Sequence, residues 1–127
     1  MAKILIVEDN PANLKLALLL LHRVGHEVLT AMDAEAGIAL ALAEHPELIL
    51  MDIQLPGMDG LAATRQLRQN TASAAIPIIA LTALAMKDDE AKALAAGCDA
   101  YIAKPLRYQE LYAAIDSLLA RGRPASA

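Results

Sequence analysis

The sequence contains no phenylalanine and no tryptophan, and it has only three tyrosines in 127 residues. Because 57% of the residues are nonetheless hydrophobic, the core must be built from aliphatic side chains and methionine. That proportion favours a globular domain over a disordered chain. A basic excess is also missing, since the formal net charge is −4. The composition therefore argues against a nucleic-acid-binding protein, which normally carries a basic face.

Cysteine and long hydrophobic runs are scarce as well. Cys98 is the single cysteine, so no disulfide can form within the chain. One free thiol is typical of a reducing cytoplasm, and with no basic neighbour in sequence we interpret it as buried and unreactive. The apolar stretch at 16–21 is followed by His22 and Arg23 and is too short to span a bilayer. The first residues, MAKILIVEDN, reach two acids too early for a signal peptide. We expect a cytoplasmic protein with no membrane partner.

Short apolar runs alternate along the chain with longer amphipathic segments. The apolar runs predict buried strands at Lys3–Val7, Glu27–Ala31, Glu47–Met51, Ile76–Leu81 and Ala100–Ala103. The intervening segments predict helices from Pro11 to about Val24, from the cap Asp33 to about His45, after Gly60 to about Gln69, up to Gly97, and from Arg107 to about Ala120. This alternation implies an α/β fold with a parallel sheet covered on both faces. We expect one domain over residues 1–121 and a short disordered tail over 122–127.

Acidic residues stand where two of these strands end. Glu8 and Asp9 follow the first strand, and Asp52 follows the third. Because the carboxyl ends of parallel strands form one edge of the sheet, these carboxylates converge if the two strands are neighbours. Three like charges at close range need a compensating cation, and Mg²⁺ prefers carboxylate oxygens and water. The pattern predicts a magnesium site, the alternative being that each acid only caps a helix or starts a turn.

Two further polar residues follow strands at the same predicted edge. Thr82 comes after the fourth strand and Lys104 after the fifth. A hydroxyl, an ammonium and a metal beside a carboxylate suit phosphoryl transfer, which depends on positioning and charge neutralisation. An ionised aspartate can act as the nucleophile and form an acyl phosphate. The alternatives are a turn hydroxyl for Thr82 and an exposed surface lysine for Lys104.

Four segments resemble those of response-regulator receiver domains of two-component systems. They are LIVEDN, LILMDIQLPGMDG, IIALTA and AYIAKP, in the order and at the spacing of that family. The resemblance covers Lys3 to about Leu119 and is nearest to single-domain regulators of the DivK and CheY kind. It implies a flavodoxin-like (βα)5 doubly wound sandwich with strand order 2-1-3-4-5.

The resemblance also assigns roles to individual residues. Asp52 matches the phosphoacceptor. Asp9 matches the direct acidic metal ligand, and Glu8 matches the neighbour that often acts through water. Gln54 matches the position whose backbone carbonyl completes the shell of the Mg²⁺ ion, for which Mn²⁺ is a possible substitute.

Four more positions carry over from the family. Thr82 matches the hydroxyl that bonds the phosphoryl oxygen, and Lys104 the cation that bridges the acids and the phosphoryl group. Tyr101 matches the aromatic switch residue that moves inward on activation. The bond from Lys104 to Pro105 is expected to be cis. We also hypothesise that Gln54 and Leu84 tune the lifetime of the phosphate, because an apolar Leu84 cannot orient the hydrolytic water.

The implied function is that of a response regulator. It accepts a phosphoryl group from a histidine kinase or a histidine phosphotransfer protein and signals through the fourth helix, fifth strand and fifth helix to a downstream protein. We expect no enzymatic activity beyond self-phosphotransfer and autodephosphorylation, no nucleic-acid partner, and a monomer or weak homodimer. A receiver module excised from a hybrid sensor kinase is the alternative.

Two more distant alternatives are disfavoured by particular positions. A phosphatase with an aspartyl nucleophile needs an acid two residues after that nucleophile, where this chain has Gln54. A flavin-binding module would need a phosphate loop rich in glycine and hydroxyl residues after the first strand, together with aromatic side chains. The loop here is EDNPAN.

Overall fold

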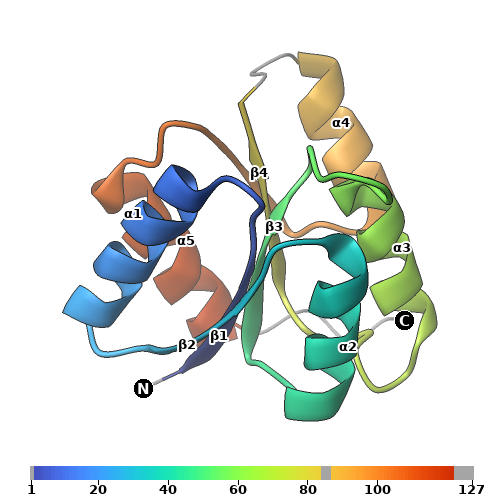
Figure 1. Ribbon diagram of the computed structural model, residues 1–127, viewed down its shortest axis with the longest axis horizontal. Coiled ribbons are helices and arrows are strands. Elements are labelled where there is room, and N and C mark those ends of the chain that lie inside the picture. The colour runs from blue at the N-terminus through green and yellow to red at the C-terminus, as the bar shows by residue number, and fades with distance from the viewer. Residues whose placement is uncertain (1, 84–86, 122–127) are drawn as a thin grey trace.

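The chain folds into one five-stranded parallel sheet with helices on both faces. The computed structural model describes residues 2–83 and 87–121. The elements in chain order are β1 (Lys3–Val7), α1 (Pro11–Arg23), β2 (Glu27–Ala31), α2 (Ala34–Glu44), β3 (Leu48–Asp52), α3 (Gly60–Gln69), β4 (Ile78–Thr82), α4 (Lys87–Ala96), β5 (Ala100–Ala103) and α5 (Tyr108–Arg121). Helices α1 and α5 cover one face, and α2, α3 and α4 cover the other (Figure 1).

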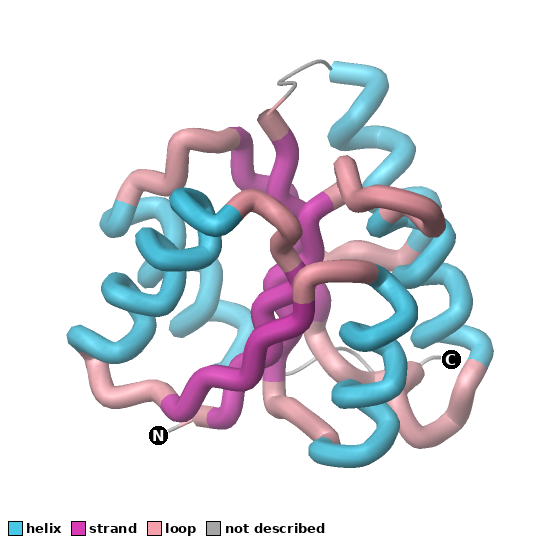
Figure 2. Tube along the Cα trace, viewed as in Figure 1, coloured by secondary structure: helices cyan, strands magenta, loops and turns pink. Residues whose placement is uncertain are grey.

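The strand order is β2-β1-β3-β4-β5, and every pair is parallel. This confirms the expected flavodoxin-like (βα)5 architecture. Figure 2 shows the strands at the centre of the molecule with helices on either side. Because β1 and β3 are neighbours, the residues that follow their carboxyl ends meet at one edge of the sheet.

Alternate residues of the strands build two separate cores. Leu5, Ile49 and Ile78 belong to the cluster under α2, α3 and α4, whereas Ile6 and Leu50 belong to the cluster under α1 and α5. Successive side chains of a strand point to opposite faces, so a strand buried on both sides must be apolar at every position. This explains the continuous apolar runs of the sequence.

Local side-chain hydrogen bonds start three of the helices. Asn10 caps α1 by accepting from the Ala12 and Asn13 N–H groups, while Asp33 caps α2 and Asp59 caps α3. Such caps satisfy amide groups that have no partner inside the helix. Helix α1 ends one residue earlier than predicted, and α5 begins one residue later.

Strands β3 and β4 lie slightly later in sequence than predicted. The expected ranges were Glu47–Met51 and 76–81, but the structure has Leu48–Asp52 and Ile78–Thr82. Pro77 has no N–H to give to the sheet, although its carbonyl accepts from Ile49. As a result of these later strand bounds, Asp52 and Thr82 are the last residues of β3 and β4 rather than the first residues of loops.

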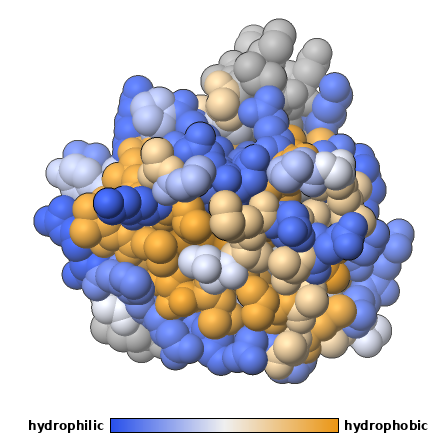
Figure 3. Space-filling model, viewed as in Figure 1, coloured by the Kyte–Doolittle hydropathy of each residue, from blue (hydrophilic) through white to orange (hydrophobic). Residues whose placement is uncertain are grey.

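The face drawn in Figure 3 carries apolar atoms near its middle, around the edge strand β2. Val28 and Leu29 of β2 are half-buried. Across the described part of the chain, no helix has the length and apolar character needed to cross a membrane. The tail expected at 122–127 lies outside the described residues.

Candidate functional site

Three acidic side chains converge at the carboxyl edge of the sheet. Glu8 and Asp9 follow β1, and Asp52 ends β3. One carboxylate oxygen from each lies within 4.8 Å of the others. Glu8 is 1% exposed and Asp52 is 2% exposed, so two of the carboxylates are largely removed from water. The structure thus brings together the three acids that sequence reasoning singled out.

Lys104 joins this cluster from the end of β5. Its Nζ lies 2.6 Å from Glu8 Oε1 and 3.0 Å from Asp52 Oδ2. The Lys104 side chain is only 11% exposed, so these contacts are largely buried and are not loose surface ion pairs. The alternative of an exposed surface lysine is therefore wrong.

Main-chain amide groups hold two of the carboxylates in place. The Gln54 N–H donates to Asp52 Oδ1 at 3.0 Å, and the Asn10 N–H donates to Glu8 Oε2 at 3.1 Å. Lys104 therefore takes one oxygen of each carboxylate, while the backbone takes the other. Both side chains are oriented before any ligand arrives.

The electrostatics of the cluster favour an added cation. Burial raises the pKa of Glu8, and the neighbouring Asp52 raises it further, while the Lys104 ammonium and the Asn10 amide oppose the shift. Burial alone would lower the pKa of Lys104, but its bonds to Glu8 and Asp52 outweigh this and the net pKa is raised. A single ammonium thus compensates the buried negative charge only in part.

The donor set fits a hard divalent cation. Three carboxylates within reach of one point, two of them buried, offer the oxygen ligands that Mg²⁺ takes. No His or Cys side chain belongs to this cluster within the described ranges 2–83 and 87–121, so the site differs in character from a typical zinc site.

The remaining predicted residues lie around the cluster. Thr82, buried at the end of β4, is paired in register with Ala103, and its carbonyl accepts from the Lys104 N–H at 2.7 Å. Tyr101 is half-buried in β5 and packs on the core under α2, α3 and α4. The bond between Lys104 and Pro105 is cis. Leu84 lies outside the described residues.

Sequence reasoning missed the contribution of Gly60. A Cβ built on Gly60 would lie 2.1 Å from the Asp52 carbonyl oxygen, and the Gly60 N–H donates to the Ile53 carbonyl at 2.9 Å. The first residue of α3 therefore packs directly on the main chain that carries Asp52. The only signal in the sequence was a glycine directly after the cap Asp59.

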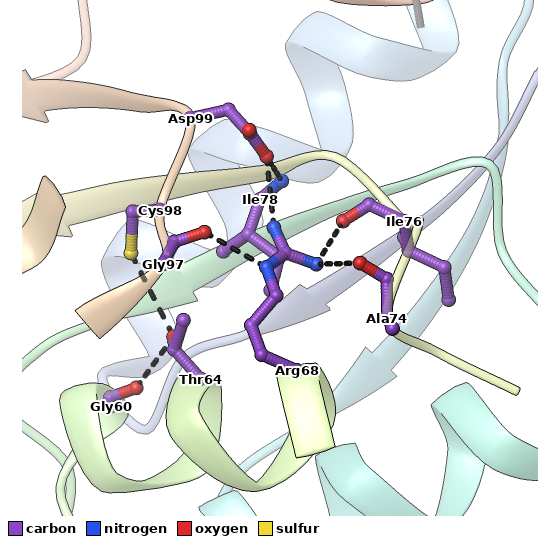
Figure 4. A network of polar contacts seen from close by, with 9 residues as sticks. All are labelled: Gly60, Thr64, Arg68, Ala74, Ile76, Ile78, Gly97, Cys98 and Asp99. Atoms are coloured by element: carbon purple, nitrogen blue, oxygen red, sulfur yellow. Dashed lines mark hydrogen bonds and ion pairs between the residues drawn. The ribbon is translucent and has the colours of Figure 1, made fainter. Parts of the chain in front are cut away.

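Arg68 and Asp99 were also missed. Arg68, near the end of α3, donates to Asp99 and to three main-chain carbonyls in the network drawn in Figure 4. The two residues are far apart in sequence and belong to no motif, so nothing in the sequence indicated their contact.

Comparisons with known proteins agree with this geometry. The family described as response regulator receiver domain matches residues 4–116. The chain is 42% identical over 116 residues to the polar-differentiation response regulator DivK of Brucella ovis. The aligned stretch covers 91% of this chain and 94% of that protein.

Solved structures give the same result. The receiver domain of a sensor histidine kinase from Pseudomonas aeruginosa PAO1, with a magnesium ion coordinated in its active-site cleft, is 36% identical with a TM-score of 0.88 and covers 94% of this chain and 98% of that one. A CheY-like receiver domain protein from Methanospirillum hungatei JF-1 is 32% identical with a TM-score of 0.87 and covers 95% of each chain. The chain thus belongs to the response regulator receiver domain family of two-component signalling.

Proposed function

We propose that this receiver domain accepts a phosphoryl group on Asp52 from the phosphohistidine of a histidine kinase or a histidine phosphotransfer protein. The observation that carries the proposal is the buried Asp52 carboxylate between two other acids and Lys104. A carboxylate used only as a helix cap would not need this surrounding. The 42% identity to a DivK response regulator supports the same reaction class.

The reaction is a direct exchange of bonds at phosphorus. An Asp52 oxygen forms a bond to phosphorus, and the bond from phosphorus to the imidazole nitrogen of the donor breaks, with its electron pair returning to that nitrogen. The product is an acyl phosphate on Asp52. The Gln54 amide and the Lys104 ammonium hold the Asp52 carboxylate in a fixed orientation for this attack.

Positive charge is needed when the phosphoryl group arrives. Glu8, Asp9, Asp52 and the Gln54 carbonyl would hold Mg²⁺, or Mn²⁺ in its place, and the ion would supply charge neutralisation to the phosphoryl oxygens. Lys104 supplies a second positive charge, and Thr82 supplies a hydroxyl donor from the end of β4. Thr82 ends β4 and Lys104 directly follows β5, and these two strands come after β3 in the sheet order.

The added phosphate would be detected by Thr82 and Tyr101. Thr82 is drawn toward the phosphoryl oxygens, and Tyr101 on the adjacent strand moves into the space that is freed. The output surface would then be α4, β5 and α5, which carries the half-exposed Leu94 on α4. A downstream protein would bind there. We place the protein in the cytoplasm as a monomer or weak homodimer, with no classical enzyme activity.

The lifetime of the phosphate is proposed to depend on Gln54 and Leu84. Gln54 is exposed beside Asp52, where its side chain can affect the approach of water to the acyl phosphate. A role as the receiver module of a hybrid kinase is the second candidate, favoured by the 36% identity to the receiver domain of a sensor histidine kinase.

Acyl-phosphate labelling tests the proposal. The protein is incubated with Mg²⁺ and a small phosphoramidate donor, and intact mass measures the gain of one phosphoryl group that hydroxylamine removes. Asp52→Asn should abolish the gain while circular dichroism stays unchanged. Full labelling of Asp52→Asn, or labelling that survives complete chelation of divalent cations, would refute the assignment.

A further inference from the structure

A second ion pair, largely but not fully buried, lies at the amino edge of the sheet, away from the acidic cluster. The Arg68 guanidinium contacts Asp99 Oδ2 at 2.9 Å, and the two side chains are only 12% and 11% exposed. Figure 4 shows Arg68 reaching from α3 toward the segment that leads into β5. A largely buried charge pair is costly to break, so this contact should hold α3 firmly against the residue that precedes β5.

Asp99 joins the first residue of β4 to the segment before β5. Its N–H donates to the Ile78 carbonyl at 2.8 Å, and its Oδ2 accepts from the Ile78 N–H at 2.9 Å. One residue thus satisfies both main-chain groups of Ile78. Because β5 is an edge strand of four residues, it pairs with β4 alone and over only four register positions.

Arg68 contacts the Asp99 carboxylate and the main chain around it. Its guanidinium also donates to the carbonyls of Ala74, Ile76 and Gly97 at 3.2, 2.7 and 2.9 Å. Gly97 leaves room for the aliphatic part of Arg68, because a Cβ there would lie 2.7 Å from Arg68 Cγ. Arg68 therefore fastens α3, the connection to β4 and the end of α4 to Asp99.

The contacts of Asp99 with Ile78 and Arg68 set the position of strand β5, which Lys104 directly follows. From Asp99 onward, β5 runs in register with β4 from Ala100 beside Ile79 to Ala103 beside Thr82. Lys104 follows directly and donates its N–H to the Thr82 carbonyl. A shift of one residue in this register would turn every β5 side chain to the opposite face. The Asp99–Ile78 hydrogen bonds hold the start of β5, and the Lys104–Thr82 hydrogen bond holds its end.

We propose that Arg68 and Asp99 are positioning residues for the phosphoryl site, acting through β5 to place Lys104 against Asp52 and Glu8. The inference rests on the proposed function and deepens it. Neither residue touches the reacting atoms, so their effect on phosphorylation is indirect, and the contacts of Asp99 with β4 and β5 route it through Lys104. A purely structural pair would instead lower stability without changing the site of the folded protein.

Labelling kinetics distinguish these two cases. Arg68→Ala is compared with Arg65→Ala, an exposed arginine on the same helix, at a temperature where circular dichroism shows both variants to be folded. Arg68→Ala should slow phosphorylation by a small-molecule donor by about tenfold or more, as misplacement of a catalytic group does. Arg65→Ala should stay within about twofold of the original chain.

A second comparison tests the route through Lys104. In a Lys104→Ala background, Arg68→Ala should slow labelling no further, since the group that it positions is already gone. The inference is overturned if Arg68→Ala labels at the original rate, or if it slows labelling by the same factor with and without Lys104.

Amide chemical shifts give a readout that does not need phosphorylation. Arg68→Ala should shift the Tyr101 and Lys104 amide signals more than those of Glu8 and Asp9. Equal or smaller shifts at Tyr101 and Lys104 would count against the inference. If the original chain takes up no phosphate, the proposed function fails, whereas these shifts still decide whether Arg68 positions β5.

Discussion

Replacing Lys104 with methionine tests the charge balance of the site directly. Methionine keeps an unbranched side chain but removes the ammonium that lies 2.6 Å from Glu8 and 3.0 Å from Asp52. Two largely buried carboxylates then face each other without their cation. Breaking a buried ion pair on one side typically costs about 3–5 kcal/mol of stability. We expect Lys104→Met to lower the free energy of unfolding by about 3 kcal/mol at pH 8 without divalent cations.

The cost should fall at lower pH because Glu8 can take up a proton. Its folded-state pKa is raised above the ordinary value of 4.5, and loss of Lys104 removes an interaction that lowers it. A carboxyl with a raised folded pKa contributes stability at pH values below its ordinary pKa, and this contribution is lost as the pH rises through the folded pKa. Lys104 itself has a pKa raised above 10.5, so it stays charged in the original chain throughout this range. The variant should therefore be least affected near pH 4.5 and most affected at pH 8.

Urea unfolding followed by circular dichroism measures both effects. Saturating Mg²⁺ should recover most of the loss, because a ligand at 100 times its Kd stabilises the folded state by about 2.7 kcal/mol. Lys15→Met, at an exposed position of α1, is the matched control and should change stability by less than about 0.5 kcal/mol. An equal loss for Lys104→Met at low and high pH, or a loss no larger than that of Lys15→Met, would refute the reasoning.

Four further outcomes are expected. Gly60→Ala should destabilise the fold by about 3 kcal/mol in urea unfolding, because its Cβ would overlap the Asp52 carbonyl oxygen. The control Gly57→Ala has open space around the added Cβ but a positive φ, and it should cost about 1 kcal/mol. A larger loss for Gly57→Ala than for Gly60→Ala would contradict this account. Mg²⁺ affinity measured by calorimetry should fall as the pH drops through the raised pKa of Glu8, whereas a flat profile from pH 5 to 8 would exclude Glu8 from the site. Tyr101→Ala should leave Asp52 labelling nearly unchanged but weaken phosphorylation-dependent binding of the downstream protein, and full binding would remove Tyr101 from the switch. Leu84→Glu should change the autodephosphorylation rate measured by the loss of labelled mass, and an unchanged rate would rule out Leu84 as a determinant of phosphate lifetime.

Helix starts and buried strands could be predicted because their causes are local. A cap such as Asn10 or Asp33 bonds to amides two or three residues away, so its sequence neighbourhood contains the whole interaction. Apolar runs such as ILIV and LILM predict strands buried on both faces for the same reason. The end of β3 was misplaced by one residue because the pairing of Asp52 with β4 is decided by another strand.

The convergence of the acids depended on strand order. The sequence placed Glu8, Asp9 and Asp52 after strands, but their meeting required β1 and β3 to be neighbours. Periodicity does not distinguish between possible strand orders, so that step came from the resemblance to a family. The fold then brought the carboxylates within reach of one ion.

The sequence by itself determined the order and approximate position of the elements and the side chains of the acidic cluster. Only the tertiary structure decided the partners: Lys104 with Glu8 and Asp52, Gly60 against the Asp52 main chain, and Arg68 with Asp99. These contacts join segments that are distant in the chain and become neighbours only when the crossovers stack the strands. Their strength comes from burial, which no local pattern records, because water is excluded by residues from the whole fold.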